Sequence, residues 1–201
     1  LDLRKIMRNP LEMTKSQKYS LTKGGFLLST GYLDPRKNLL RKIEAFGIHV
    51  QRTGSSLKYA LSGLKTSLSS DVLDLIEKPH LKDKVFFLGY LSTNDLKVLM
   101  GASTSLMYCS IAEGFGLPII EAMASGAPVI TSHTTSMLEL AEGRAELVNP
   151  EDVDDIARAI DTVAATDRKL IDARCHENVE YARKFTIESW LLGHLKEYQE
   201  L

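Results

Sequence analysis

The sequence predicts an α/β fold, a Rossmann-like doubly wound parallel sheet of about six strands with a helical C-terminal tail. Short apolar runs alternate with helical patterns, which is typical of βα units and a parallel sheet. The runs are apolar on both faces, as in strands that helices cover on both sides. After Asn149-Pro150 only helical patterns remain, and these predict the tail.

The expected elements follow one another in regular order. Strands are expected at 25–29, 57–62, 85–88, 105–109, 128–131 and 146–148. Helices are expected near 36–46, 70–78, 93–101, 117–124 and 136–141, and the tail helices at 151–165, 168–184 and 187–199. Ser92-x-x-Asp95 and Ser136-x-x-Glu139 resemble capping boxes, in which both side chains accept backbone N–H groups at a helix start.

Composition indicates one ordinary globular domain. The 201 residues can bury a substantial core, and 44% are hydrophobic and 25% charged. A net charge of −1 and the lack of a basic patch argue against nucleic-acid binding. Residues 1–23 hold six Lys or Arg against two acids, and we interpret them as a linker or N-terminal tail before a domain at 24–201. Since the chain begins with Leu1, we expect it to be a piece of a longer protein.

The expected compartment follows from the cysteines and from the apolar runs. Cys109 and Cys175 make neither a disulfide framework nor a metal-ligand pattern, and Cys109 in its apolar run is expected to be a buried thiol. A reducing cytoplasm is the simplest setting. No apolar run approaches the roughly 18 residues of a membrane-spanning helix. Peripheral contact with the inner face of the membrane, through the missing part of the protein, stays open.

The segment 113–121, Glu-Gly-Phe-Gly-Leu-Pro-Ile-Ile-Glu, carries the strongest functional signal. Gly114 and Gly116 let a backbone approach a ligand closely, and Pro118 suits the first turn of a helix. The free N–H groups at such a helix start favour an anionic phosphate. Glu113 before the helix and Glu121 one turn inside it could accept hydrogen bonds from sugar hydroxyls on either side of a diphosphate.

A second cluster follows the first strand, at Asp34-Pro-Arg-Lys-Asn38. Lys37 is a flexible point charge that could reach a diphosphate, and Arg36 could fork onto phosphate oxygens. Ligands of doubly wound sheets bind beyond the carboxyl ends of the strands, which is where both clusters fall. The alternative is two basic residues on a solvated first turn.

Bland alternatives also exist for the carboxylates. Glu113 could simply cap the following helix, and Glu121 could be a surface acid, although its apolar neighbours suggest substantial burial. Asp152-Val-Asp154 resembles a short metal motif, but acids at this point fit the first turn of a helix better. We expect no metal site, and the motifs of P-loop, dinucleotide-binding and serine-hydrolase proteins are absent from the sequence.

These motifs resemble the Glu-x7-Glu signature of retaining glycosyltransferases with the GT-B fold, group 1 or family four. The similarity continues through 122–130 and includes 31–38, 43–46, 85–89 with 92–96, and 147–152, in the family's order, so it covers roughly residues 25–200. It implies one half of a GT-B fold, the C-terminal domain that binds the sugar donor. The N-terminal acceptor half, with its catalytic histidine or equivalent, would then be missing.

The resemblance also implies roles for individual residues. Lys37 and Glu113 would be catalytic, stabilising the leaving diphosphate and orienting the transferred sugar, and Glu121 would bind the ribose. The backbone N–H groups of Phe115, Gly116 and Leu117 would bind the sugar hydroxyls and the phosphate. Gly89 and Tyr90 would lie at the nucleotide base. The family often has Arg where this chain has Tyr32, so Arg36 is the substitute for a second phosphate contact.

The expected function is therefore retaining transfer of a hexose from a UDP- or GDP-sugar to an acceptor, in polysaccharide or glycolipid synthesis. Mannose is a guess that no residue supports. No cofactor or metal is expected, and the partners are the nucleotide-sugar donor and the missing acceptor domain. Two alternatives stay open: a non-catalytic, donor-like binding module, and a GT-B phosphorylase or epimerase that uses the same phosphate site.

Overall fold

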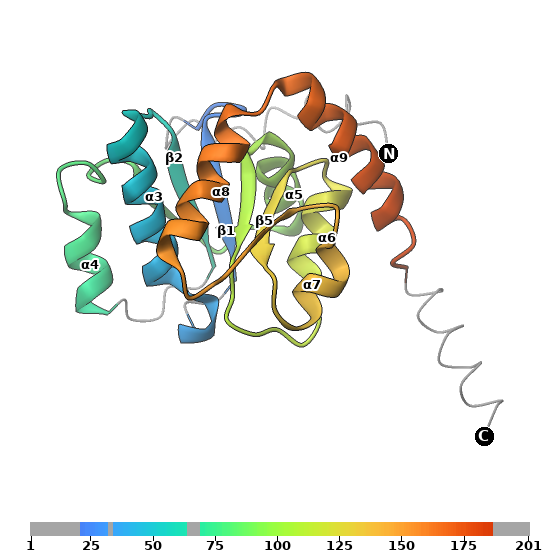
Figure 1. Ribbon diagram of the computed structural model, residues 1–201, viewed down its shortest axis with the longest axis horizontal. Helices are drawn as coiled ribbons and strands as arrows, with labels where there is room; N and C mark the ends of the chain where they lie inside the picture. Colours follow the sequence, from blue (N-terminus) through green and yellow to red (C-terminus); the bar gives the residue numbers. More distant parts are fainter. Residues whose placement is uncertain (1–20, 32–33, 64–68, 187–201) are drawn as a thin grey trace.

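The computed structural model describes residues 21–31, 34–63 and 69–186, which form one parallel sheet covered by helices on both faces (Figure 1). The strand order is β3-β2-β1-β4-β5-β6, and every pairing is parallel. The strands are β1 (Phe26–Thr30), β2 (Lys58–Ser62), β3 (Val85–Gly89), β4 (Ser105–Tyr108), β5 (Val129–Ser132) and β6 (Glu146–Val148). The predicted fold class is confirmed, and the strands lie within about a residue of their expected positions.

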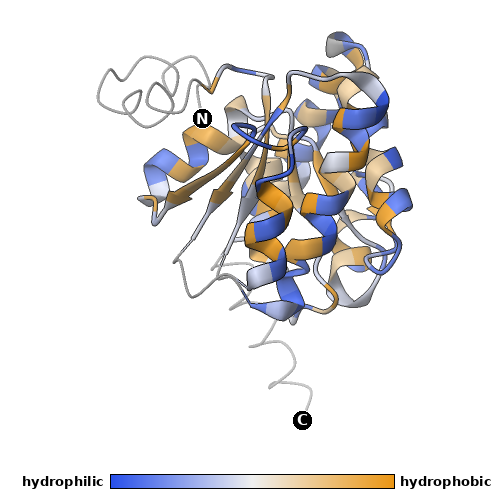
Figure 2. Cartoon of the chain, turned by 90° about the vertical axis from the view of Figure 1, so that its left-hand side faces the viewer, coloured by the Kyte–Doolittle hydropathy of each residue, from blue (hydrophilic) through white to orange (hydrophobic). Residues whose placement is uncertain are grey.

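Helices pack in two layers because each presents one apolar face to the sheet. One layer holds α3 (Leu39–Thr53), α4 (Ser70–Ile76) and α8 (Val153–Ala165), and the other holds α5 (Thr93–Ala102), α6 (Leu117–Ala124), α7 (Thr135–Ala141) and α9 (Arg168–Ala182). Phe46 of α3 and Ile160 of α8 belong to the first core, and Met123 of α6 belongs to the second. In Figure 2 the strands are mainly hydrophobic and the helices alternate between hydrophobic and hydrophilic faces.

The order of the strands creates a switch point between β1 and β4. From β1 the chain moves outward through β2 to β3, and it then returns to place β4 on the other side of β1. The crossovers that leave β1 and β4 therefore run in opposite directions, so the loops after these two strands diverge at the carboxyl edge of the sheet. Open α/β sheets bind ligands at such a point.

The helix expected near 36–46 is two elements instead of one. A 3-10 turn, η2 (Pro35–Lys37), precedes α3, and Asn38 between them adopts a left-handed conformation with φ 55°. Asparagine tolerates this region better than most residues. The break was missed because the helical pattern runs through Asn38 without a glycine or proline after it.

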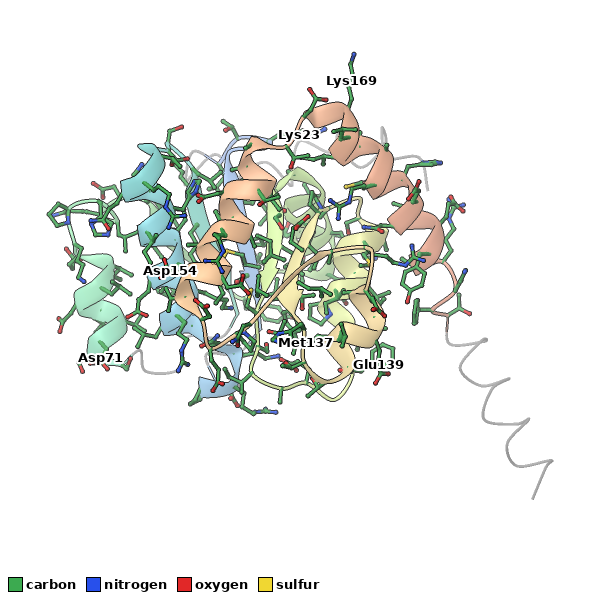
Figure 3. All side chains as sticks on the ribbon, in the orientation of Figure 1. Lys23, Asp71, Met137, Glu139, Asp154 and Lys169 are labelled. Atoms are coloured by element: carbon green, nitrogen blue, oxygen red, sulfur yellow. The ribbon has the colours of Figure 1, made fainter. Side chains whose placement is uncertain are left out.

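One of the two expected capping boxes is wrong. Ser92 caps α5 as expected, because its hydroxyl accepts a hydrogen bond from the N–H of Asp95. Helix α7 instead begins at Thr135 after Thr134. The hydroxyl of Ser136 donates to the carbonyl of Glu113, and the exposed Glu139 lies on the outer side of α7 (Figure 3). Ser136 therefore makes a tertiary hydrogen bond instead of the helix cap that the local sequence pattern predicts.

The tail begins with two helices, as expected. Asp152 caps α8 by accepting from the N–H of Asp155, which confirms the helix-start interpretation of the acids after Asn149-Pro150. Helix α9 packs against α6. The helix expected at 187–199 and most of the expected linker at 1–23 lie outside the described residues. Within the described ranges no helix is long and apolar enough to cross a membrane.

Candidate functional site

The loops after β1 and β4 meet at the switch point, and each contributes one charged side chain. Nζ of Lys37, at the end of η2, lies 2.7 Å from Oε1 of Glu113 and 2.8 Å from the hydroxyl of Tyr108. The side chains of Lys37 and Glu113 are only 18% and 12% exposed. The sequence placed Lys37 and Glu113 in one strand-end region, and the structure brings them into contact.

The pKa values of the pair shift in opposite directions. Burial lowers the pKa of Lys37, but the hydrogen bonds to Glu113 and Tyr108 outweigh it and raise that pKa above its ordinary value. Burial likewise raises the pKa of Glu113, but the hydrogen bond from Lys37, the charge of Lys37 and the neighbouring hydroxyls together outweigh it, so that this pKa is lowered. Both groups are therefore charged at neutral pH. An ammonium has three donors, of which described residues use two, so one N–H of Lys37 can serve a ligand.

Asn38 connects the loop after β1 to the segments that follow β4 and β6. Its side-chain amide donates to the carbonyl of Cys109 at 3.1 Å and to the carbonyl of Pro150 at 2.6 Å, and Asn38 is buried. The N–H of Ile111 donates to the carbonyl of Arg36 across the same gap. These bonds tie together the segments that follow β1, β4 and β6. The turn that carries Lys37 is therefore held in place by the hydrogen bonds of the next residue, Asn38. The predicted burial of Cys109 is confirmed.

Helix α6 presents its N-terminus directly after Glu113. Gly116 caps the helix with φ 99°, and a Cβ there would lie 3.2 Å from the side chain of Ile119 and 3.4 Å from that of Leu140. Glycine is thus favoured by this conformation, and any side chain would crowd Ile119 and Leu140. Pro118 occupies the first turn, as expected. The positive dipole end of α6 therefore faces the loop that carries Glu113.

Glu121 is exposed, and the expectation of substantial burial is wrong. Its apolar neighbours Ile119, Ile120, Ala122 and Met123 lie on the buried side of α6, whereas Leu117, Glu121 and Ala124 are exposed. Positions three and four apart share a helix face, so Glu121 belongs to the solvent side of the turn that Leu117 begins. An exposed carboxylate at this place remains accessible to a ligand on the same side.

The remaining predicted residues spread around this centre. Phe115 is exposed and makes an edge contact with Phe185, with the ring centroids 6.3 Å apart. Arg36 is paired with Asp34, its Nε 3.2 Å from Oδ1, and its side chain is 65% exposed. Gly89 ends β3 with φ 70°, and Tyr90 after it is exposed. The structure thus brings Lys37, Glu113 and the α6 N-terminus together and leaves Arg36 on the surface with Asp34.

A cavity of about 170 Å³ lies at the carboxyl ends of β1, β2 and β3. Its lining includes Thr30, Gly31, Lys37, Lys42, Gly63 and Gly89. Two of the side chains around Lys37 were missed by the sequence interpretation. Tyr108 is hidden in an apolar strand, and Lys42 resembles an ordinary surface lysine of an amphipathic helix. The available signals were a phenol at the carboxyl end of a strand and a lysine four residues before the buried Phe46.

Within 21–31, 34–63 and 69–186, no group of three or more His, Cys, Asp or Glu side chains could hold a metal ion. The positive charges near the described site include Lys37, Lys42 and the N-terminus of α6. The residues of Asp152-Val-Asp154 belong to the start of α8.

Comparison with known proteins gives consistent results. The model of the family "Glycosyl transferases group 1" matches residues 12–185. O-antigen chain mannosyltransferase B of Escherichia coli is 36% identical over 157 residues, which cover 77% of this chain and 41% of that protein. O-antigen chain mannosyltransferase RfbU of Salmonella typhimurium is 38% identical over 130 residues, which cover 65% and 36%. The chain thus spans less than half the length of these curated relatives.

The fold has close structural neighbours. The crystal structure of Anabaena HepE in complex with UDP and glucose superposes with a TM-score of 0.81 at 22% identity, covering 100% of this chain and 55% of the other. At this identity the similarity establishes the fold. The chain therefore covers only part of this longer structure, as it also covers only part of the curated relatives.

Proposed function

The chain belongs to the group 1 glycosyl transferases, since their family model matches residues 12–185, and from this premise we propose that it is the donor-binding half of a retaining hexosyltransferase. The complete protein would take a hexose from a nucleoside diphosphate sugar. Mannose is the proposed hexose because the two relatives described above are named mannosyltransferases. The acceptor half would be supplied by sequence outside this chain, which spans less than half of those relatives.

The observation that carries the proposal is the meeting of Lys37, Glu113 and the α6 N-terminus at the switch point. A cation, a carboxylate and the positive end of a helix within one small region suit a ligand that combines phosphates with hydroxyls. Lys37 and the helix end would bind the diphosphate, and Glu113 would accept hydrogen bonds from the sugar. Glu121, on the exposed side of α6, would accept from the ribose hydroxyls.

In the transfer, the bond between the anomeric carbon and the phosphate oxygen breaks while a bond to the acceptor hydroxyl oxygen forms on the same face. The acceptor's proton passes to the departing diphosphate. Negative charge grows on that diphosphate in the transition state, and Lys37 with the α6 N-terminus would stabilise it there. Glu113 would hold both the sugar and the ammonium of Lys37, and Tyr108 would fix the lysine from its other side.

Calorimetric titration of the chain with UDP, GDP and ADP tests the proposal. We expect saturable binding of UDP or GDP, with affinity reduced about 10-fold or more in both Lys37→Met and Glu121→Gln. Glu139→Gln is the matched control, because Glu139 is an exposed glutamate on the neighbouring helix α7 (Figure 3). Absence of binding to all three nucleotides at millimolar concentration would contradict a donor site in this chain.

A further inference from the structure

Lys42 is a buried lysine whose charge the described residues leave largely unmatched. It lies on α3, is 3% exposed, and its Nζ is 3.2 Å from the hydroxyl oxygen of Ser29. Ser29 donates its own proton to the carbonyl of Met107 at 2.6 Å, so it accepts from Lys42 and from Tyr59, whose hydroxyl is 2.7 Å away. Among the described residues, Ser29 is the one acceptor of an ammonium that has three donors.

The other donors of Lys42 have the cavity beside them. Lys42 lines the cavity of about 170 Å³ at the carboxyl ends of β1–β3, which offers roughly ten times the room that one water molecule requires. Thr30 lines the same cavity, and its buried hydroxyl has no hydrogen-bond partner in the part of the chain that the structure describes. Unsatisfied buried polar atoms are costly, so the unpartnered hydroxyl of Thr30 and the two unused donors of Lys42, beside one cavity, indicate that a polar ligand completes these hydrogen bonds.

The net positive charge around the cavity favours an anion as that ligand. Lys37 also lines the cavity, but Glu113 neutralises it at 2.7 Å. Lys42 has no carboxylate partner within the described residues, which leaves one net positive charge at the cavity. Burial lowers the pKa of Lys42 to about 8, so the ammonium is still largely protonated at pH 7.

A purely structural role for Lys42 would need a different arrangement. Buried charges that stabilise a fold are paired with an opposite charge, because their desolvation is expensive. Lys42 has instead a single hydroxyl partner, on a serine whose other bonds are already made. Arg36, on the same loop as Lys37, is engaged with Asp34 at the surface.

We propose that Lys42, together with the hydroxyl of Thr30, binds phosphoryl oxygens of the donor's diphosphate in the cavity that Lys37 also lines. Lys42 thus supplies the second cationic contact of the phosphate site. This inference rests on the proposed function, since it assigns the anion to the same nucleotide-sugar donor. It adds a residue from the second turn of α3 to a site built otherwise from strand-end loops and the α6 N-terminus.

Titration of Lys42→Met and Lys42→Gln with UDP and GDP, and with the corresponding monophosphates, tests this assignment. We expect the affinity for the diphosphate that the unmodified chain binds to fall about 10- to 100-fold in both variants, as for loss of a charged hydrogen bond. The preference for diphosphate over monophosphate should shrink as well. Lys82→Met is the matched control, because the exposed Lys82 precedes β3 at its amino end, whereas the cavity lies at the carboxyl ends of the strands. The affinity of this variant for the diphosphate should stay within about twofold of that of the unmodified chain.

Thermal melting of the same variants separates binding from folding. We expect Lys42→Met to melt at or above the temperature of the unmodified chain while binding the diphosphate less tightly. Unchanged affinity in the two Lys42 variants would overturn the inference and leave the proposed function standing. A fall in melting temperature that accompanies the loss of affinity in both variants would show a structural lysine and overturn it too. Failure of the unmodified chain to bind UDP or GDP would remove the proposed function itself.

Discussion

Replacing Lys42 by Met should stabilise the protein at neutral pH, although it removes a buried hydrogen bond. Burial lowers the pKa of Lys42 from 10.5 to about 8, a fall of about 2.5 units. At about 1.36 kcal/mol per unit, the folded protein carries roughly 3 kcal/mol of unfavourable free energy when this lysine is charged. Methionine has a similar length without the charge. Loss of the bond to Ser29 offsets about 1 kcal/mol, so we expect a net gain of about 2 kcal/mol at pH 7.

The pH dependence gives the sharper signature. The unfolded chain holds the Lys42 proton up to about pH 10.5, whereas the folded protein releases it near pH 8. Between these values the unfolded state binds more protons, so the contribution of Lys42 to stability rises with pH. Below pH 8 the cost is constant. Stability of the unmodified chain should therefore approach that of Lys42→Met as the pH is raised from 8 towards 10.5.

Urea denaturation of both chains at pH 7, 8, 9 and 10 measures this difference directly. Subtracting the two curves cancels the titration of the groups that the substitution leaves unaffected. Cys109, Lys37 and Glu113 interact electrostatically with Lys42 and are not among those groups. A variant that is less stable than the unmodified chain at pH 7 would refute the reasoning. A stability difference that is the same at all four pH values would refute it as well.

Substitutions at three further positions test how the loops and the start of α8 are held, each by the free energy of unfolding in urea. Gly63→Ala should cost about 3 kcal/mol or more, because φ is 147° there and a Cβ would overlap the carbonyl of Gly31; a loss below 1 kcal/mol would show that the loop can move aside. Asn38→Ala should cost about 3 kcal/mol, from two lost hydrogen bonds and a left-handed alanine, and a cost near zero would deny that Asn38 braces the site. Asp152→Ala should cost about 1 kcal/mol, while Asp152→Asn, which keeps the cap of α8, should cost little; equal losses in the two would contradict the capping role.

The fold could be read from the sequence because its signals are local and redundant. Each strand is a short apolar run followed by a helical pattern, and six such units leave little choice of architecture. The helix near 36–46 shows where this reasoning fails. The break at Asn38 is stabilised by carbonyls of Cys109 and Pro150, which are 71 and 112 residues away. No local pattern contains those partners.

The candidate site could be predicted in part for the same reason. Lys37 and Glu113 lie in strand-end loops, and the topology alone brings such loops together. The burial of Glu121 was mispredicted because neighbours in sequence were taken for neighbours in space, whereas helix geometry sends them to opposite sides. Lys42 was missed because burial of a charge is exceptional, so the sequence favours the surface for any lysine.

The central position of β1 has a consequence for the order of events during synthesis. One edge of β1 can pair with β2 soon after both leave the ribosome, but its other edge pairs with β4, at Leu27 with Ser105 and Leu28 with Leu106. About 80 residues separate these partners, which at about 5–20 residues per second is a wait of roughly 4 to 16 seconds. During this interval an apolar strand has an open edge that another nascent chain could occupy. Glu113 follows β4 in the chain, so its contact with Lys37 can form only after that strand has been synthesised.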